Sequence, residues 1–533
     1  MSRPERRVAR HRATGDGRPR LAPSSLLLYA APVVAVLAGV ALYLQREWAI
    51  AGLWGFSLDD SWIHAVFARN LATGNGFSFN PGEPVSGSTG PLYSAILSLL
   101  YLVTGEMVWT GKVFGILCQI AATLLLLRAG LHLERPAAWP GAPASTAAVP
   151  WKALTAAVLM GMSPSLLWAS LSGMEISLYL LFVCAGLERT LAGKDVAATL
   201  WWSLGVWVRP DGLFLVALRM LGPRATLLKR VAMAGAFIVP LVAFNLWLGG
   251  TPLPQTVGAK AAWGLDLGHR TWNLIREWGA LWGLPFRVDD ELEHPLLLLP
   301  LLLLGAALLW KRFPLLALYV VGLPLAFSLF RENSASHKRY IVYVVPFGLL
   351  LAVTALGWLS ARLPRAFGKR AFAAVALVAI LWQGAMVVRK ADTHGWNVQN
   401  INMMQRLLGT TAGNTTPPGA TIAASDIGAI GYFSHRRVVD LMGLVSVSRS
   451  LPENLTRYQP ALLIINVDWF GRYARPDSAS GFFAFYDTDS TTKYTAMAAV
   501  ELSHNTICSA DQMVAFARQK PGDPPPPLYF HRF

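Results

Sequence analysis

The run LLLYAAPVVAVLAGVALYL, from Leu26 to Leu44, decides the fold class of this chain. Its nineteen residues carry no charge and match the roughly 20 that a helix needs to cross a bilayer. Residues 1–24 hold seven arginines against Glu5 and Asp16, and such a basic flank favours the cytoplasmic side. A cleaved signal peptide is the alternative, but the run is long for one and no small-x-small cleavage site follows cleanly. We therefore expect a retained span behind a cytoplasmic basic arm, 1–24.

The composition of the whole chain supports a membrane protein. Of its 533 residues, 54% are hydrophobic and 14% are charged, whereas a soluble domain carries about 25% charged residues. These numbers exclude a disordered chain and a collagen-like fibre. Three cysteines without a Cys-x-x-Cys pair exclude a disulfide framework and give no sign of zinc or an iron–sulfur cluster.

Further apolar segments follow and predict an α-helical polytopic membrane domain at residues 25–388, with about 11 transmembrane helices. Several segments are shorter than roughly 20 residues, which leaves their number and bounds open. After the first run they cover residues 107–127, 153–170, 176–187, 197–208, 213–221, 231–248, 295–310, 313–330, 341–359 and 371–388. Residues 45–106 form a long outer loop. Its apolar part, Pro91–Thr104, either crosses the membrane or lies along its surface.

The charge of the loops tests this topology. If Pro91–Thr104 does not cross, the loops on the side of the N-terminus hold 22 Lys or Arg and five acids. The opposite loops, without the C-terminal tail, hold ten Lys or Arg and fourteen acids. The positive-inside rule predicts this bias. The net charge of +16 is then mostly a topology signal, and we expect no nucleic-acid partner.

Residues 389–533 have the composition of a soluble domain on the outer side. Short apolar strands at 421–424, 438–441 and 461–467 alternate with turn-rich segments. We expect a small extracytoplasmic α/β domain there, following the last span.

The outer loop contains a polar run that composition does not explain. It begins SLDDSWIH at Ser57 and continues as ARNL from Ala68. Adjacent carboxylates beside a membrane span are costly unless they face a cavity, where one can act as a general base or bind a cation. The alternative is an N-cap, with Asp59 or Asp60 opening a short helix that ends at Gly74. The two roles are compatible.

Other outer segments add charged candidates. Glu175 ends a turn between two spans, and Arg209 precedes a Pro-Asp-Gly turn. Lys260 follows a Pro-rich loop, while His337 and Arg339 lie at the outer end of a span. Solvated loop charge, or snorkelling for Arg209, is the alternative explanation for each. A water-filled outer cavity lined by these groups would suit a phosphate leaving group and a hydroxyl nucleophile.

The outer loop resembles the first outer loop of the GT-C glycosyltransferases. The likeness is carried by Asp59-Asp60, the ARNL block, Gly74-Asn75-Gly76 and Phe79 to Glu83. Within that superfamily it is most similar to the terminal arabinofuranosyltransferases of mycobacterial cell walls. Weaker blocks follow in the same order, at 172–175, 208–211, 254–260, 339–340, 425–432 and 440–444.

This resemblance implies an integral-membrane enzyme that transfers a sugar from a polyprenyl-phosphate donor to a glycan or lipid acceptor. It favours Pro91–Thr104 as an interfacial helix, because the family has such helices in this loop. It implies an inverting transfer with an acidic base, for which we favour Asp59, with Asp60 positioning the acceptor or the base. Glu175 corresponds to a second acidic position near the site.

The resemblance also suggests how the donor is held. Arg209, Lys260 and Arg339 are the candidates to hold the lipid phosphate, since an Arg fork binds phosphate bidentately. His337 is a weaker candidate, as a donor to the leaving oxygen. Some members of the superfamily use a divalent cation, which adjacent carboxylates could bind. We therefore predict no certain cofactor and leave the metal requirement open.

The family is largely bacterial, so we expect a multi-pass protein of the cytoplasmic (inner) membrane. Its N-terminus would lie inside and its C-terminal domain outside. The alternative function is a transporter or flippase of lipid-linked sugars. A transporter would more often carry charged or broken segments on both faces with a site at the midplane. A non-catalytic membrane scaffold is a further alternative, but it leaves the outer acids and cations without a role.

Overall fold

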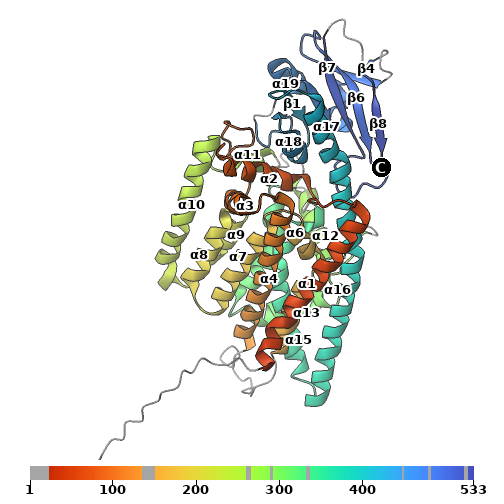
Figure 1. Cartoon of the computed structure of the whole chain (residues 1–533). Coiled ribbons are helices and arrows are strands. Elements are labelled where there is room, and N and C mark those ends of the chain that lie inside the picture. The colour runs from red at the N-terminus through yellow and green to blue at the C-terminus, as the bar shows by residue number, and fades with distance from the viewer. Residues whose placement is uncertain are drawn as a thin grey trace, which may run out of the picture.

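The structure, a computed structural model, describes residues 23–134, 150–259, 266–287, 292–331, 336–446, 449–477, 482–520 and 526–533. A bundle of helices forms the larger part of the molecule, and a sheet domain lies beyond one end of it (Figure 1). Most of the predicted basic arm, and also Lys260, fall outside the described residues.

The bundle is built from helices of very unequal length. They are α1 (Pro23–Ala51), α4 (Met107–Glu134), α5 (Trp151–Gly161), α6 (Pro164–Leu171), α7 (Ile176–Leu191), α8 (Asp195–Val206), α9 (Gly212–Met220), α10 (Leu227–Gly249), α12 (Leu267–Leu281), α13 (Leu298–Leu309), α14 (Pro314–Ser328), α15 (Val345–Ser360) and α16 (Arg365–Ile401). In the described part, five helical runs are long and apolar enough to span a membrane. They contain α1, α4, α10, α15 and α16. The pair α5–α6, bent by 53°, would make a sixth.

The predicted count of about eleven spans is not confirmed. Helices α13 and α14 are apolar but only 12 and 15 residues long, below the roughly 20 that a perpendicular span needs. Helix α7 has 14 of its 16 residues buried, so that other helices, rather than lipid, surround it. Apolar composition therefore marks burial inside the bundle as well as contact with lipid.

Helix α16 links the bundle to the sheet domain without a break. Its 37 residues run past the predicted boundary at 389 to Ile401. One π-helical turn (Asn402–Arg406) and α17 (Leu407–Thr415) then continue the rod into the sheet domain. The polar residues after Val388 form the last turns of a long helix instead of a linker.

The C-terminal domain is a mixed sheet with short helices, as predicted. Its strands are β1 (Thr421–Ala424), β2 (Arg437–Asp440), β3 (Leu462–Ile465), β4 (Arg475–Asp477), β5 (Phe482–Tyr486), β6 (Lys493–Glu501), β7 (Gln512–Gln519) and β8 (Tyr529–Arg532). They follow the order β2-β1-β3-β7-β6-β5-β4, with β8 on β6. Strands β2, β1 and β3 are parallel, and β3 pairs antiparallel with β7. The helices are α18 (Gly428–Ser434), α19 (Leu451–Tyr458) and α20 (Val467–Phe470).

The outer loop fills the space between bundle and sheet. It contains α2 (Asp59–Ala72) and α3 (Pro91–Thr104), which lie at the end of the bundle nearest the sheet domain (Figure 1). Leu462 and Ile464 of β3 pack in one cluster with Ile63 and Phe67 of α2. Alternate side chains along β3 point to opposite faces, and thus one face of the sheet is closed by α2.

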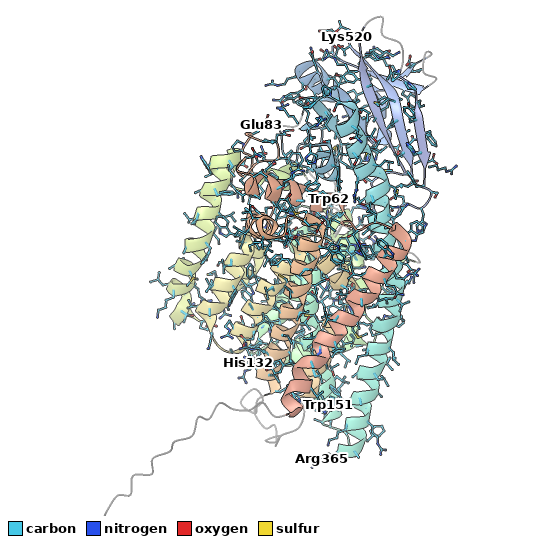
Figure 2. All side chains as sticks on the ribbon, in the orientation of Figure 1. Trp62, Glu83, His132, Trp151, Arg365 and Lys520 are labelled. Atoms are coloured by element: carbon cyan, nitrogen blue, oxygen red, sulfur yellow. The ribbon has the colours of Figure 1, made fainter. Side chains whose placement is uncertain are left out.

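Trp62 of α2 lies where the two parts of the molecule meet (Figure 2). Its ring is 4.9 Å from Phe56 in the outer loop, and 4.9 and 4.8 Å from Tyr432 and Phe433 of α18. Such aromatic pairs add to the free energy gained by burying apolar area. Through Trp62, helix α2 therefore packs against both the outer loop at Phe56 and helix α18 of the sheet domain.

Candidate active site

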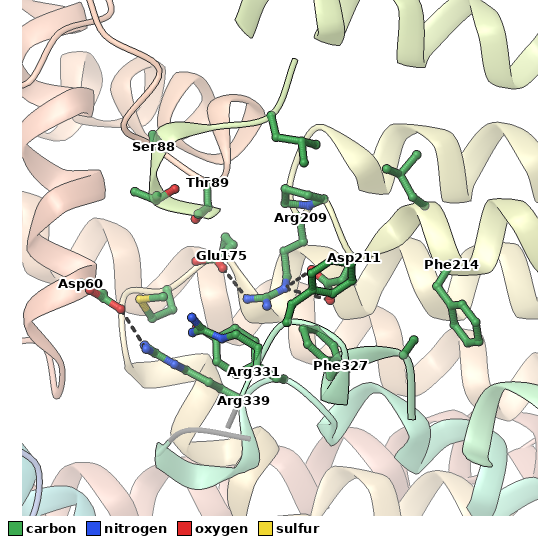
Figure 3. A pocket seen from close by; sticks show the side chains of 18 of the residues that line it. Asp60, Ser88, Thr89, Glu175, Arg209, Asp211, Phe214, Phe327, Arg331 and Arg339 are labelled. Carbon is green, nitrogen blue, oxygen red and sulfur yellow. Dashed lines mark hydrogen bonds and ion pairs between the residues drawn. The ribbon is translucent and has the colours of Figure 1, made fainter. Parts of the chain in front are cut away.

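A cavity of about 470 Å³ lies between the outer loop and the helical bundle. Its polar end is lined by Asp60, His64, Ser88, Thr89, Glu175, Arg209, Asp211, Arg331, Arg339 and Tyr340. Asp60 and Arg339 lie on one side of the cavity and Phe214 on the other (Figure 3).

Asp60 and Arg339 form the first ion pair of this cavity. Arg339 Nη2 lies 2.9 Å from Asp60 Oδ2. The Nε and Nη1 atoms of Arg339 are buried and have no hydrogen-bond partner among the described residues. A buried donor without a partner is costly, and Arg339 is one of the residues that line the cavity. Arg331 lines the cavity too, with its guanidinium 4.3 Å from the centre of the Tyr340 ring.

A second set of charged groups forms a chain through Glu175. Glu175 Oε1 accepts a hydrogen bond from Arg209 Nη1 at 2.6 Å, and Oε2 lies 3.1 Å from His64 Nε2. Arg209 Nε also donates to Asp211 Oδ1 at 3.0 Å. Glu175 is 1% and Arg209 6% exposed, so these charges depend on each other for compensation. Two carboxylates occupy Arg209 Nη1 and Nε, so that these atoms are less available to a phosphate than Nε and Nη1 of Arg339.

Local backbone geometry explains how Glu175 and Arg209 reach the cavity. Gly173 has a φ of 76°, a conformation that favours glycine, and a Cβ there would lie 2.4 Å from Phe56. The turn that follows places Glu175 directly before α7. On the other wall, Arg209 precedes the Pro-Asp-Gly turn, where Gly212 N–H donates to the Arg209 carbonyl at 3.0 Å.

The other end of the cavity is apolar. Side chains of α9 and α14 and of the segment after α14 form it, and they are Leu213, Phe214, Ala217, Leu323, Ala326, Phe327 and Phe330. The cavity therefore joins a hydrophobic arm to a charged end. This combination suits a ligand with an apolar chain and an anionic head.

Asp59, the acid that we favoured as base, does not line this cavity. Its two carboxylate oxygens accept hydrogen bonds from the backbone N–H groups of Gly428 and Ala429, each at 2.8 Å. Burial and the nearby Asp426 carboxyl raise the pKa of Asp59 to about 7, although the two N–H groups act in the opposite direction. Burial raises the pKa of Asp426 as well.

The cap expected for α2 is also different. The N-cap position is Leu58, and Asp59 and Asp60 both lie in the first turn. Asp59 instead binds the first N–H groups of α18, a helix of the sheet domain. The end of α2 is close to the prediction, since Gly74 follows it with a φ of 81°.

His337 is not part of the cavity lining. Its ring stacks on Trp168 with the ring centres 4.2 Å apart, and Nε2 lies 2.8 Å from Asn397 Oδ1. A role for His337 at the leaving oxygen therefore has no geometric support. Lys260 lies outside the described residues.

Much of the motif that carries the family resemblance binds the sheet domain. Asn80 exchanges two hydrogen bonds with the backbone of Val438, at 2.9 and 3.0 Å. Glu83 pairs with Arg437 at 2.7 Å, and Arg69 donates to the Tyr432 carbonyl at 2.7 Å. These residues hold the two parts of the molecule together instead of contacting the cavity.

Sequence reasoning did not select six of the ten charged or polar residues named for this end of the cavity. They are His64, Ser88, Thr89, Asp211, Arg331 and Tyr340. Residues i and i+4 share one face of a helix, and this spacing from Asp60 could have identified His64. Arg331 gives no comparable local signal, because it reaches the cavity through the packing of the segment after α14.

The metal requirement can be examined only through the donor set. Among the residues that the structure describes, no group of three or more His, Cys, Asp or Glu side chains is arranged to hold a metal ion. Dependence on a divalent cation therefore stays a question for experiment.

Comparisons with known proteins give a family model for part of the chain. The model described as "Domain of unknown function (DUF8728)" matches residues 393–516, which make up most of the sheet domain together with the end of α16. A search of curated proteins finds no match.

Solved structures match over most of the chain. ArnT from Cupriavidus metallidurans in the apo state has 12% identity and a TM-score of 0.54, covering 90% of this chain and 97% of its own. The archaeal oligosaccharyltransferase AglB from Archaeoglobus fulgidus, in complex with an inhibitory peptide and a dolichol-phosphate, has 13% identity and a TM-score of 0.56, covering 83% and 70%. Both are GT-C proteins, and the chain shares their fold, with several helices apolar enough to span a membrane. The narrower similarity to arabinofuranosyltransferases stays a prediction.

Proposed function

We propose that this protein is a membrane glycosyltransferase that moves a sugar from a polyprenyl-phosphate donor to a glycan or lipid acceptor on the outer face of the membrane. The cavity carries this proposal, because its apolar arm continues into an end with Asp60 and two nitrogens of Arg339 that have no partner in the described part of the chain. A lipid phosphate bearing a sugar has the same order of chemical parts. AglB, which shares the fold, was solved with a dolichol-phosphate bound.

The positions of the side chains support a division of roles. The prenyl chain would lie along α9 and α14, with the phosphate on Arg339 Nε and Nη1. Arg331 and Tyr340 complete this end. Glu175 and Arg209 would position the sugar and His64 through their ion pairs. Asp60, the member of the acidic pair that lines the cavity, is favoured as the base.

The reaction then follows from these positions. The Asp60 carboxylate takes a proton from an acceptor hydroxyl as its oxygen attacks the anomeric carbon. The bond from that carbon to the phosphate oxygen breaks with inversion, and the electron pair leaves on the polyprenyl phosphate. Arg339 compensates the negative charge that develops on the leaving group. No further proton is needed, since the phosphate is stable as an anion.

The first experiment identifies donor and acceptor together. We expect a deletion strain to lose one terminal sugar from a surface glycan or envelope lipid. That truncated material then serves as acceptor for the purified protein, with polyprenyl-phosphate pentose and hexose as donors. Release of polyprenyl phosphate with formation of the glycoside supports the proposal. Intact glycans in the deletion strain contradict it.

The same assay separates transfer from transport. A flippase would move the lipid-linked sugar between leaflets without breaking the bond between sugar and phosphate. Reconstituted protein that translocates a fluorescent donor but releases no polyprenyl phosphate would favour that alternative. We expect the opposite result.

A further inference from the structure

The sheet domain contributes no residue to the described lining of the cavity. Among the residues that the structure describes, those that line the cavity all belong to the segment from Asp60 to Tyr340, while the sheet domain begins after residue 401. Any influence of this domain on the cavity must therefore pass through the segments that it touches. Helix α2 and the loop at Gly87, which lies against Leu444 and Val445, are in contact with both.

Asp59 makes the contact nearest to the reacting groups. Its carboxylate accepts hydrogen bonds from the N–H groups of Gly428 and Ala429, and its neighbour Asp60 forms an ion pair with Arg339. The approach is close, because a Cβ on Gly428 would lie 2.0 Å from the Asp59 carbonyl oxygen and 2.9 Å from its Oδ2. Only glycine at position 428 leaves room for the Asp59 side chain and backbone to approach α18 this closely.

We propose that Asp59 is a positioning residue through which the sheet domain fixes the orientation of Asp60. This inference rests on the proposed transferase function. The sheet domain would then hold the first turn of α2 in place, so that the Asp60 carboxylate points toward the bound donor.

The physical reason is the stiffness of a helix turn. Adjacent residues on a helix point roughly 100° apart, so that fixing Asp59 to α18 fixes the direction of Asp60. A displacement of about 1 Å at a reacting group costs about 10²-fold in rate. The lipid arm and Arg339 belong to the bundle, and the nitrogens proposed for the phosphate, Nε and Nη1, are not the one that pairs with Asp60. We therefore expect the loss of the Asp59 contact to act on kcat much more than on the binding of polyprenyl phosphate.

The test uses two variants on opposite sides of the contact. Asp59→Asn keeps the volume of the side chain but removes its charge, and Gly428→Ala inserts a methyl group into the contact between Asp59 and α18. Gly471→Ala is the matched control, because a Cβ there meets nothing within 4 Å. For each full-length protein we would measure kcat of sugar transfer, the Kd for polyprenyl phosphate without sugar, and hydrogen exchange of α2.

We expect both variants to lower kcat by about 10–10²-fold, to leave the Kd for polyprenyl phosphate unchanged, and to speed exchange in the first turn of α2. The double variant should be no slower than the slower single variant, since both break one contact. Gly471→Ala should match the wild type in all three measurements.

Two outcomes would overturn the inference. Full activity of Gly428→Ala beside an inactive Asp59→Asn would make Asp59 the base itself, and losses that multiply in the double variant would show independent roles. The first outcome would change which acid is the base, and neither outcome would remove the transferase activity. The transferase proposal fails separately, if the wild-type protein releases no polyprenyl phosphate and the deletion strain keeps its glycans intact.

Discussion

The two faces of α2 bury acidic groups in different ways. On the cavity face, Asp60 and His64 meet charged side chains, Arg339 and Glu175. On the sheet face, Asp59 is held by backbone N–H groups, and Ile63 and Phe67 pack into the apolar cluster beneath β3. A side chain that pairs with another side chain can turn away and bind a substrate instead. A backbone N–H group can move only if the helix or strand that contains it moves too. We therefore expect the cavity face of α2 to take part in sugar transfer, and the sheet face to hold the bundle and the sheet domain together.

The largest expected effect separates these faces directly. Asp60→Asn should lower the transfer rate by about 10²–10⁴-fold, the usual contribution of a general base, with little change in thermal stability. Turnover at saturating donor and acceptor measures it. Asp468→Asn, which changes an exposed acid of the sheet domain, should have no effect. Activity of Asp60→Asn near that of the wild type would move the chemistry away from this face.

The next effect concerns the cation opposite Asp60. Arg339→Ala removes the two nitrogens proposed for the phosphate, and loss of hydrogen bonds to a charged group costs about 1.5–3 kcal/mol. The expected loss of kcat/KM for the donor is therefore about 10–10²-fold. Arg339→Lys should restore only part of it, because lysine lacks the planar fork. Equal activity of the Ala and Lys variants would argue against recognition of phosphate by this fork.

A smaller effect is expected on the assembly side. Strand β2 ends the sheet, and Asn80 satisfies the backbone of Val438 on its open edge. Asn80→Ala should lower the free energy of opening at Val438 by about 1–3 kcal/mol, as measured by hydrogen exchange. The exposed Asn75 serves as control. Unchanged protection at Val438 would show that Asn80 does not hold the edge.

The smallest effect depends on pH. Asp59 has a pKa of about 7 in the folded protein against about 3.9 in an unfolded chain. At Asp59 the folded state thus binds more protons, and the contribution of this group to stability is fully present below about pH 4 and is lost as the pH rises through 7. Asp426→Asn removes the like charge, lowers the pKa of Asp59 and should stabilise the protein at pH 8 by on the order of 1 kcal/mol.

Thermal unfolding at pH 5 and pH 8 checks this prediction. The stabilisation by Asp426→Asn should be larger at pH 8, and the exposed Asp489 offers a matched control as Asp489→Asn. An equal shift at both values of pH would mean that the two carboxyl groups do not interact.

Several features followed from residue order alone. The first helix, the bounds of Pro91–Thr104 and the strand at 421–424 match their predictions, because long apolar runs and short β-rich runs are local signals. The number of spans did not follow, since α7 is as apolar as a lipid-facing helix while lying inside the bundle. The length of α16 was also missed, because its last turns are polar where they enter the sheet domain.

The candidate site shows the same limit at finer scale. The sequence by itself predicted that two adjacent acids and several charged outer turns lie on one side of the membrane, and only the resemblance to the GT-C loop grouped them in one site. Only the tertiary structure decided that Asp60 faces the cavity and Asp59 faces α18. Neighbouring helical residues point in different directions, and the partner of each is set by segments hundreds of residues away, which no local pattern encodes.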